Sequence, residues 1–241
     1  MTPERFRQGM TFDEYVAYAG TPENLRREAG WWRGPQRADF SGLLRAWYER
    51  NPLTAPQTAA IRWLAAHPDG PARVLVISEE WSSDCRRDVP MLARLAEAGA
   101  MELRIFPRDG QKLGRGATAD PAESPNAVLV NAFLNVKNGQ TFQSVPVAAF
   151  FTRDFRYLCH YIEYPAIYHK DPLAEAMQAR VRAHESPERW ARFIEDWGAL
   201  QQSPFFAIWA GATVDEIISA LYERILVGGF GGPFRGPPMS N

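Results

Sequence analysis

The chain has 241 residues, of which 46% are apolar, and its formal net charge is −1. This composition supplies a hydrophobic core and excludes global disorder, because disordered chains combine low hydrophobicity with high net charge. A balanced charge also argues against a surface that follows the phosphates of a nucleic acid. We therefore expect a soluble globular protein that does not bind nucleic acid.

The N-terminal residues, MTPERFRQGMTFDEYV, lack the apolar segment of a secretory signal. No apolar run approaches the roughly 20 residues that span a bilayer, so we expect a cytoplasmic protein without a membrane partner. The two cysteines, Cys85 and Cys159, are too far apart in sequence for a metal-ligand motif and too few for a disulfide framework. We expect no metal, no cofactor and no disulfide between these two residues.

Residues 1–70 are predicted to form an N-terminal helical extension. Thr11–Glu14 and Thr54–Gln57 both fit a capping box, in which the Thr oxygen and the Glu or Gln side chain satisfy backbone N–H groups at a helix start. Leu43, Leu44, Trp47 and Tyr48 recur at helical spacing between these two motifs.

Residues 71–165 change in character and predict an α/β core. The β-branched run at 73–78 predicts a strand covered on both faces, and a helix that ends at Ala98-Gly99 follows it. Further elements are expected in this order: a strand at 101–106, a loop at 108–122, a helix at 124–134, a turn at Asn138-Gly139, and strands at 147–151 and 156–162. This order implies a parallel pair joined by a crossover, followed by an antiparallel hairpin.

Residues 166–228 are predicted to be helical again, and residues 229–241 to form a flexible Gly- and Pro-rich tail. Ser186-Pro187 is a typical helix start. Trp190, Phe193, Ile194 and Trp197 would form the apolar stripe of that helix. Thr213–Glu216 is a further candidate capping box before another apolar helix.

The segment from Val74 to Cys85 ends in Trp81-Ser82-Ser83-Asp84-Cys85, and Pro90 follows five residues later. It resembles the thioredoxin active-site segment, in which a buried strand precedes a Trp and a Cys-x-x-Cys at a helix start. Ser144-Val145-Pro146, followed by an apolar strand, resembles the thioredoxin cis-proline loop. The chain is therefore identified as similar to the thioredoxin-like superfamily, with a degenerate Trp-Ser-Ser-Asp-Cys motif. Its opening residues, from Phe6 to Tyr15, also resemble the helical lead-in of a bacterial thioredoxin-like subgroup whose motif reads Trp-Cys-Gly-Asp-Cys or Trp-Cys-Gly-Asp-Ala.

This resemblance implies a mixed sheet flanked by helices and a groove between Trp81–Cys85 and Val145–Pro146. It also implies a cis bond before Pro146, the alternative being an ordinary trans proline at a strand start. The sequence departs from the family at Ser82, which stands where the family has its attacking cysteine. A serine cannot form the motif disulfide with Cys85, so any oxidoreductase activity would lack its usual first thiol.

The roles of the motif residues stay open at this point. Cys85 could be a reactive thiol at a helix N-terminus or a small buried residue that fills the core. Ser82 or Ser83 could cap the helix, and Trp81 could shield the motif or close the core. His160, Glu163 and His169 have no standard zinc spacing, and we expect them to be solvated or satisfied by hydrogen bonds.

Three functions follow from these possibilities. The first is a one-cysteine redox protein, in which Cys85 forms a mixed disulfide with glutathione or a protein thiol partner; it predicts that native Cys85 is alkylated faster than Cys159. The second is a redox-inactive module that binds a peptide or partner in the cis-proline groove through Trp81, Ser83, Asp84, Val145 and Pro146. The third is a thiol peroxidase, because Ser82-x-x-Cys85 resembles the peroxiredoxin core. Ser78 stands where peroxiredoxins have a proline, which counts against it.

Overall fold

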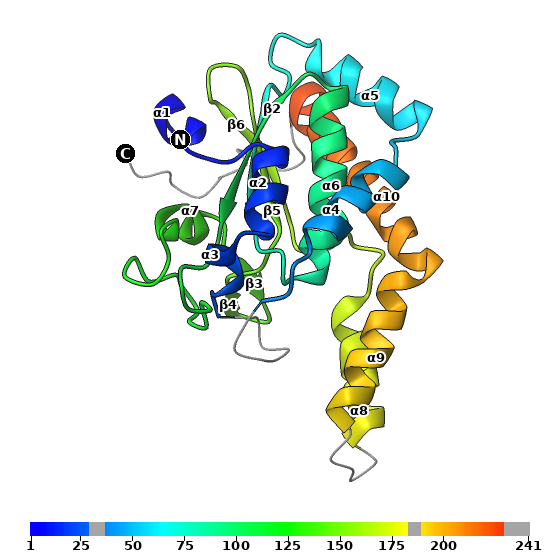
Figure 1. The fold of residues 1–241 in the computed structure, drawn as a ribbon. Coiled ribbons are helices and arrows are strands. Elements are labelled where there is room, and N and C mark those ends of the chain that lie inside the picture. Colours follow the sequence, from blue (N-terminus) through cyan, green and yellow to red (C-terminus); the bar gives the residue numbers. More distant parts are fainter. Residues whose placement is uncertain (29–36, 183–188, 229–241) are drawn as a thin grey trace.

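A four-stranded mixed sheet lies at the centre of the molecule (Figure 1). The computed structural model describes residues 1–28, 37–182 and 189–228. The strand order is β2-β1-β5-β6, with bounds β1 Arg73–Ser78, β2 Glu102–Pro107, β5 Val147–Phe151 and β6 Tyr157–Ile162. β1 is parallel to β2 and antiparallel to β5, and β6 is antiparallel to β5. The predicted α/β class and order of strands are confirmed.

Helices cover both faces of this sheet. α6 forms the crossover between β1 and β2. Three further helices, α4, α5 and α10, pack against α6. Figure 1 shows α7 on the opposite side of the sheet from α6. The helix bounds up to this point are α1 Pro3–Arg7, α2 Phe12–Ala19, α3 Pro22–Leu25, α4 Ser41–Arg50, α5 Ala55–Ala65, α6 Ser83–Ala98 and α7 Ala127–Ala132. The predicted helix at 124–134 is thus shorter at both ends.

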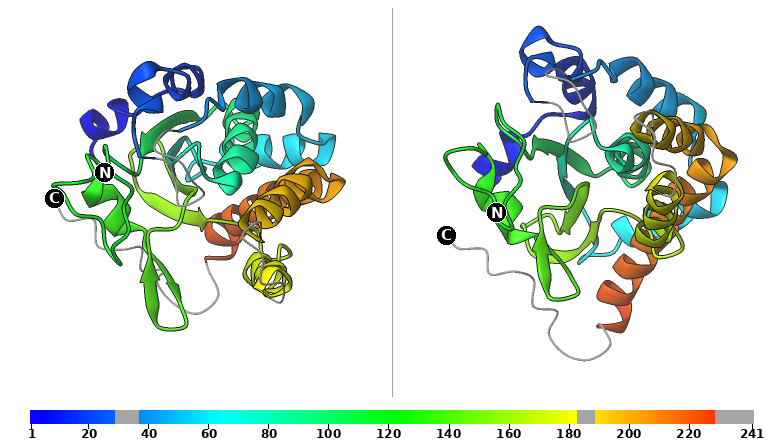
Figure 2. Two further views of the ribbon diagram at one scale, coloured as in Figure 1. Left: turned by 60° about the horizontal axis from the view of Figure 1, so that its bottom comes forward. Right: turned by 90° about the horizontal axis from the view of Figure 1, so that it is seen from below.

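A short hairpin, β3 Asn135–Lys137 and β4 Gln140–Phe142, surrounds the predicted Asn138-Gly139 turn. Both turn residues have positive φ, 51° and 74°, which Asn and Gly tolerate best and which two-residue hairpin turns require. The turn was predicted and the strands were not, because three-residue strands are too short to give an alternating pattern. The right-hand view of Figure 2 shows this hairpin projecting from the body of the molecule.

The C-terminal helices are α8 Lys170–Arg182, α9 Arg189–Gln202 and α10 Pro204–Tyr222, followed by the π-helical turn η1 Glu223–Val227. Figure 1 shows α8 and α9 extending away from the sheet. Phe193 and Trp197 of the predicted stripe are buried, whereas Ile194 is 38% exposed. The Ser186-Pro187 helix start, the side chain of Trp190 and the predicted tail lie outside the described residues.

Both capping boxes of the N-terminal segment form as predicted, at Thr11 and at Thr54. The predicted capping box at Thr213 is wrong, because α10 runs through this position without a break. Thr213 lies in the middle of α10, and its side chain is buried. The hydroxyl bonds to Asp88 Oδ1 at 3.1 Å and to the Tyr161 hydroxyl at 3.0 Å. A Thr-x-x-Glu pattern inside a long helix is indistinguishable in sequence from one at a helix start.

Of the described residues, one helix, Pro204–Val227, is long and apolar enough by length and composition to cross a membrane. The expectation that no apolar stretch approaches this length is therefore wrong: the polar residues within this segment interrupt the apolar run but leave its mean hydropathy high. This helix contacts α5, α6 and β6, and its buried side chains include Phe206 and Leu221. The helix thus packs on the sheet domain along one face, and 33% of its most apolar window is buried.

One hydrophobic core joins the sheet to both helical segments. It includes Phe6 and Leu44 from the N-terminal segment and Ile217 from α10, together with residues of all four strands of the sheet. The helices of the N-terminal and C-terminal segments therefore pack against the sheet and share one hydrophobic core with it.

Substitution Thr213→Val should lower the free energy of unfolding by about 1–3 kcal/mol, because it removes one buried hydrogen bond from the Asp88 carboxylate and one from the Tyr161 hydroxyl, although these two groups still bond to each other. Urea unfolding measures this loss. Ser219→Ala, on an exposed position of the same helix, is the matched control and should change stability by less than about 0.5 kcal/mol. Equal, small effects of both changes would show that the buried bonds contribute nothing.

Candidate functional site

The motif segment lies where β1 ends and α6 begins. Ser82 occupies the N-cap position in an extended backbone conformation, and its N–H donates to the Glu79 carbonyl at 3.0 Å. Trp81 precedes it and is half-buried, and Asp84 and Cys85 lie in the first turn. The sequence-based placement of the motif at a strand-to-helix junction is therefore correct.

The Cys85 thiol is fully buried beneath this junction. The Glu79 N–H donates to Cys85 Sγ at 3.4 Å, and the hydroxyls of Ser78 and Ser82 also bond to the thiol. Burial nevertheless outweighs these bonds and raises the pKa of Cys85 to about 12. On the order of one thiol in 10⁵ is then ionised at pH 7, so the thiol is neither accessible nor activated.

Neither serine caps the helix through its side chain. Ser82 stands at the N-cap, but its hydroxyl makes no bond to the backbone of the first turn and contacts the Cys85 thiol instead. Ser83 is the first helical residue. The predicted side-chain cap is wrong because a buried sulfur competes for the only hydroxyl at the right position.

The cis-proline loop lies across from this helix start. The Val145–Pro146 bond is cis, and the Glu163 N–H donates to the Pro146 carbonyl at 2.8 Å. Among the described residues, the N–H and C=O of Val145 have no hydrogen-bond partner. Backbone groups near the interior are nearly always paired, so this free peptide group is an available docking point.

A cavity of about 560 Å³ opens between the two segments. This volume falls within the roughly 300–1,000 Å³ typical of ligand pockets. Of the predicted site residues, Trp81, Ser82 and Val145 line it, whereas Ser83, Asp84, Cys85 and Pro146 do not. Its other walls come from the 114–117 loop, from the end of the β3–β4 hairpin, and from Arg108, Glu163 and Lys170. We call this cavity the groove.

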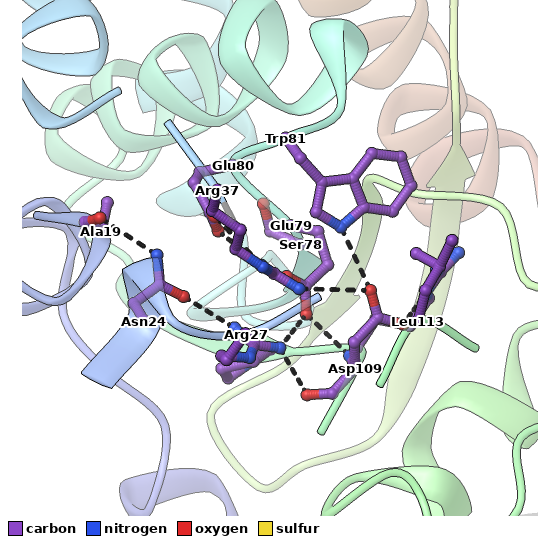
Figure 3. Close-up of polar contacts among 12 residues, drawn as sticks. Ala19, Asn24, Arg27, Arg37, Ser78, Glu79, Glu80, Trp81, Asp109 and Leu113 are labelled. Carbon is purple, nitrogen blue, oxygen red and sulfur yellow. Dashed lines mark hydrogen bonds and ion pairs between the residues drawn. The ribbon is translucent and has the colours of Figure 1, made fainter. Parts of the chain in front are cut away.

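A buried charge cluster behind Trp81 was not predicted (Figure 3). The Glu79 carboxylate is completely buried and accepts bonds from Arg27 NH2 at 2.8 Å, from Arg37 and from the Asp109 N–H at 2.7 Å. Burial raises the pKa of Glu79, and the two guanidinium groups act in the opposite direction. We call Arg27, Arg37, Glu79, Glu80 and Asp109 the Glu79 cluster.

The cluster fixes the wall of the groove. Arg27 also donates to the carbonyls of Asp109 and Gly110, and Trp81 Nε1 donates to Asp109 Oδ2 at 3.1 Å. The indole therefore has a fixed position over the groove. The only local sign of this cluster in the sequence is the pair of carboxylates directly before Trp81. Their arginine partners lie some forty or fifty positions earlier, in the N-terminal segment, so the local sequence does not reveal the ion pairs.

Glu163 is the second residue that sequence reasoning undervalued. It has a φ of 71°, a conformation uncommon for a residue with a side chain. Its carboxylate accepts bonds from Ser144 Oγ at 2.8 Å, and from Lys137 and Lys170, both at 2.9 Å. Burial alone would raise its pKa, but the two lysines lower the pKa to about 2. The Glu163 side chain is satisfied by hydrogen bonds, as expected. It links the cis-proline loop, β3 and α8 beside the groove.

The described residues contain no group of three or more His, Cys, Asp or Glu side chains that could hold a metal ion. The two cysteines are both free and buried.

Substitution Arg27→Met should lower the free energy of unfolding by about 3–5 kcal/mol, because it removes a partner of the buried Glu79 carboxylate. Arg45→Met is the matched control: the Arg45 side chain is 39% exposed, its partner Asp13 is more so, and it should cost less than about 1 kcal/mol. Chemical denaturation of both variants provides the comparison. Similar losses in the two variants would contradict a structural role for the Glu79 cluster.

Cys85 should react with iodoacetamide no faster than Cys159 in the native protein. Both thiols are buried, and burial raises the pKa of each to about 12. Since only the thiolate reacts, labelling should rise with pH up to at least pH 10 without a plateau. Peptide mass spectrometry gives the rate for each site. Rapid labelling of Cys85 with a midpoint below pH 8 would indicate an activated thiol.

Comparisons with known proteins give a family match over part of the chain and similar solved structures. A family model described as thioredoxin matches residues 43–114. Of the solved structures, a protein of unknown function from Pseudomonas aeruginosa has a TM-score of 0.50 at 15% identity, over 90% of this chain and 93% of that one. An HIV epitope-scaffold has a TM-score of 0.48 at 15% identity, over 90% and 95% of the two chains. No curated protein matches the sequence. The match covers β1, α6 and β2 with the Trp81–Cys85 motif, so this part of the chain is similar to the thioredoxin family.

Proposed function

We propose that this protein is a redox-inactive thioredoxin-like module that binds an extended peptide segment of a partner in the groove. The observation that carries the proposal is the unpaired peptide group of Val145, which lines the groove opposite Ser82. An extended peptide placed along this loop would pair its backbone with the N–H and C=O of Val145, as an added strand does at a sheet edge.

The environment of the motif residues supports binding over thiol chemistry. Ser82 replaces the exposed thiol, and the remaining thiol of Cys85 is fully buried and protonated at neutral pH. A mixed disulfide or a sulfenic acid both require a thiolate that a second molecule can reach. The buried thiol therefore disfavours the one-cysteine redox hypothesis and the peroxidase hypothesis alike.

The walls of the groove are suited to hold a ligand in a fixed orientation. Trp81 is tied to Asp109, and the cis-proline loop is tied to Glu163 through Ser144 and Pro146. A wall that is already ordered loses little conformational entropy on binding. The groove is thus preorganised on the two sides where a peptide would lie.

A library of displayed random peptides provides the test, with the immobilised chain as bait under reducing conditions. Enriched peptides should bind in solution, and Ala117→Trp should abolish binding because residue 117 is exposed at the groove wall. Ala59→Trp is the matched control, since Ala59 is exposed on α5 and does not line the groove; it should bind as the native chain does. Fluorescence polarisation measures the affinities.

Three outcomes would contradict the proposal. The library could yield no enriched peptide, or Ala117→Trp and Ala59→Trp could bind equally well. Capture that occurs without reductant and is reversed by dithiothreitol would instead identify a mixed disulfide, and would restore the one-cysteine redox hypothesis.

A further inference from the structure

The charges that line the groove are paired within the protein. Arg108 Nε donates to Asp109 Oδ1 at 2.8 Å, and the rest of its guanidinium donates to the carbonyls of Gln143 and Gly114. Arg115, at the solvent side, pairs with Glu28 at 2.6 Å. The Arg108 charge is therefore neutralised by a buried carboxylate, and the Arg115 charge by an ion pair at the surface, where its side chain is 64% exposed.

The opposite wall is compensated in the same way. Lys170 Nζ pairs with both Asp84 and Glu163, and its side chain is 19% exposed. The Glu163 carboxylate is bonded to Lys137, Lys170, Ser144 and the side-chain amide of Asn135. A carboxylate has about four acceptor positions, so this one has no capacity left for a ligand.

What the groove does leave open is neutral. The indole of Trp81, the ring of Phe142, which is 41% exposed, and the Val145 side chain supply apolar surface. Gln140 and Thr141 and the free Val145 peptide group supply uncharged hydrogen-bonding groups. These groups suit a peptide backbone and apolar side chains.

A charged side chain entering this groove would lose hydration without gaining a free counter-ion. Such burial is unfavourable unless the charge is paired, whereas the burial of apolar side chains is favourable in proportion to the area removed from water. We propose that the groove selects peptide segments that are uncharged and carry apolar side chains, and that it discriminates against acidic and basic segments alike. This inference rests on the proposed function and names the ligand class of the same site.

The test compares three synthetic peptide mixtures of equal length: neutral with apolar residues, acidic with Asp and Glu, and basic with Lys and Arg. The neutral mixture should bind at least tenfold more tightly than either charged mixture. Its affinity should change less than twofold between 50 and 500 mM NaCl, because screening affects only uncompensated charges. A preference for either charged mixture, or a steep salt dependence, would overturn the inference while leaving peptide binding intact. Failure of all three mixtures to bind would overturn the proposed function itself.

Glu163→Gln tests the origin of the selectivity. It removes the negative charge that compensates Lys137 and Lys170, and should increase binding of the acidic mixture at least tenfold. Asp171→Asn is the matched control: Asp171 also pairs with Lys137, at 2.9 Å, but does not line the groove. It should leave the preference unchanged. Lys170→Gln provides the converse variant, with an expected shift toward the basic mixture. Unchanged preferences in both groove variants would show that charge compensation does not set the selectivity.

Discussion

The buried carboxylate of Glu79 is the group on which the groove depends. A carboxylate without solvent is stable only where cations and N–H groups surround it, so its burial demands Arg27, Arg37 and the Asp109 N–H in fixed places. These three partners come from the N-terminal segment and from the loop after β2. One charge at the end of β1 therefore determines how two distant segments meet beside the motif.

The same end of β1 holds the Cys85 thiol in the core. The backbone N–H of Glu79 donates to the sulfur, while its side chain lies in the Glu79 cluster. In a redox thioredoxin-like domain the motif must expose a thiolate; here a serine, itself buried, occupies the first motif position, and the remaining thiol is completely buried. The groove does not depend on a second motif cysteine, because its walls are held by backbone contacts and by buried ion pairs.

Local sequence signals predicted the central part of the fold. The apolar run of β1, the helix start after Trp81 and the proline at 146 each depend on a few neighbouring residues, and each lies where it was expected. The Glu79 cluster could not be predicted in this way, since Arg27 lies 52 positions before Glu79 and nothing in the local pattern pairs them. The error at Thr213 has the opposite cause, because its local pattern fits a helix start although the residue lies in the middle of α10. Its place is explained by a distant residue, the buried Asp88 of α6, to which its hydroxyl bonds.

The most direct measurement is the hydrogen exchange of the Trp81 indole N–H, assigned by comparison with Trp81→Phe. If the Glu79 cluster holds Asp109 and hence Trp81 in place, this proton should exchange only through rare opening, at least a hundredfold more slowly than a free indole. Exchange at the rate of a free indole in the native protein would show that the groove wall is mobile, and would contradict the structural origin of the site.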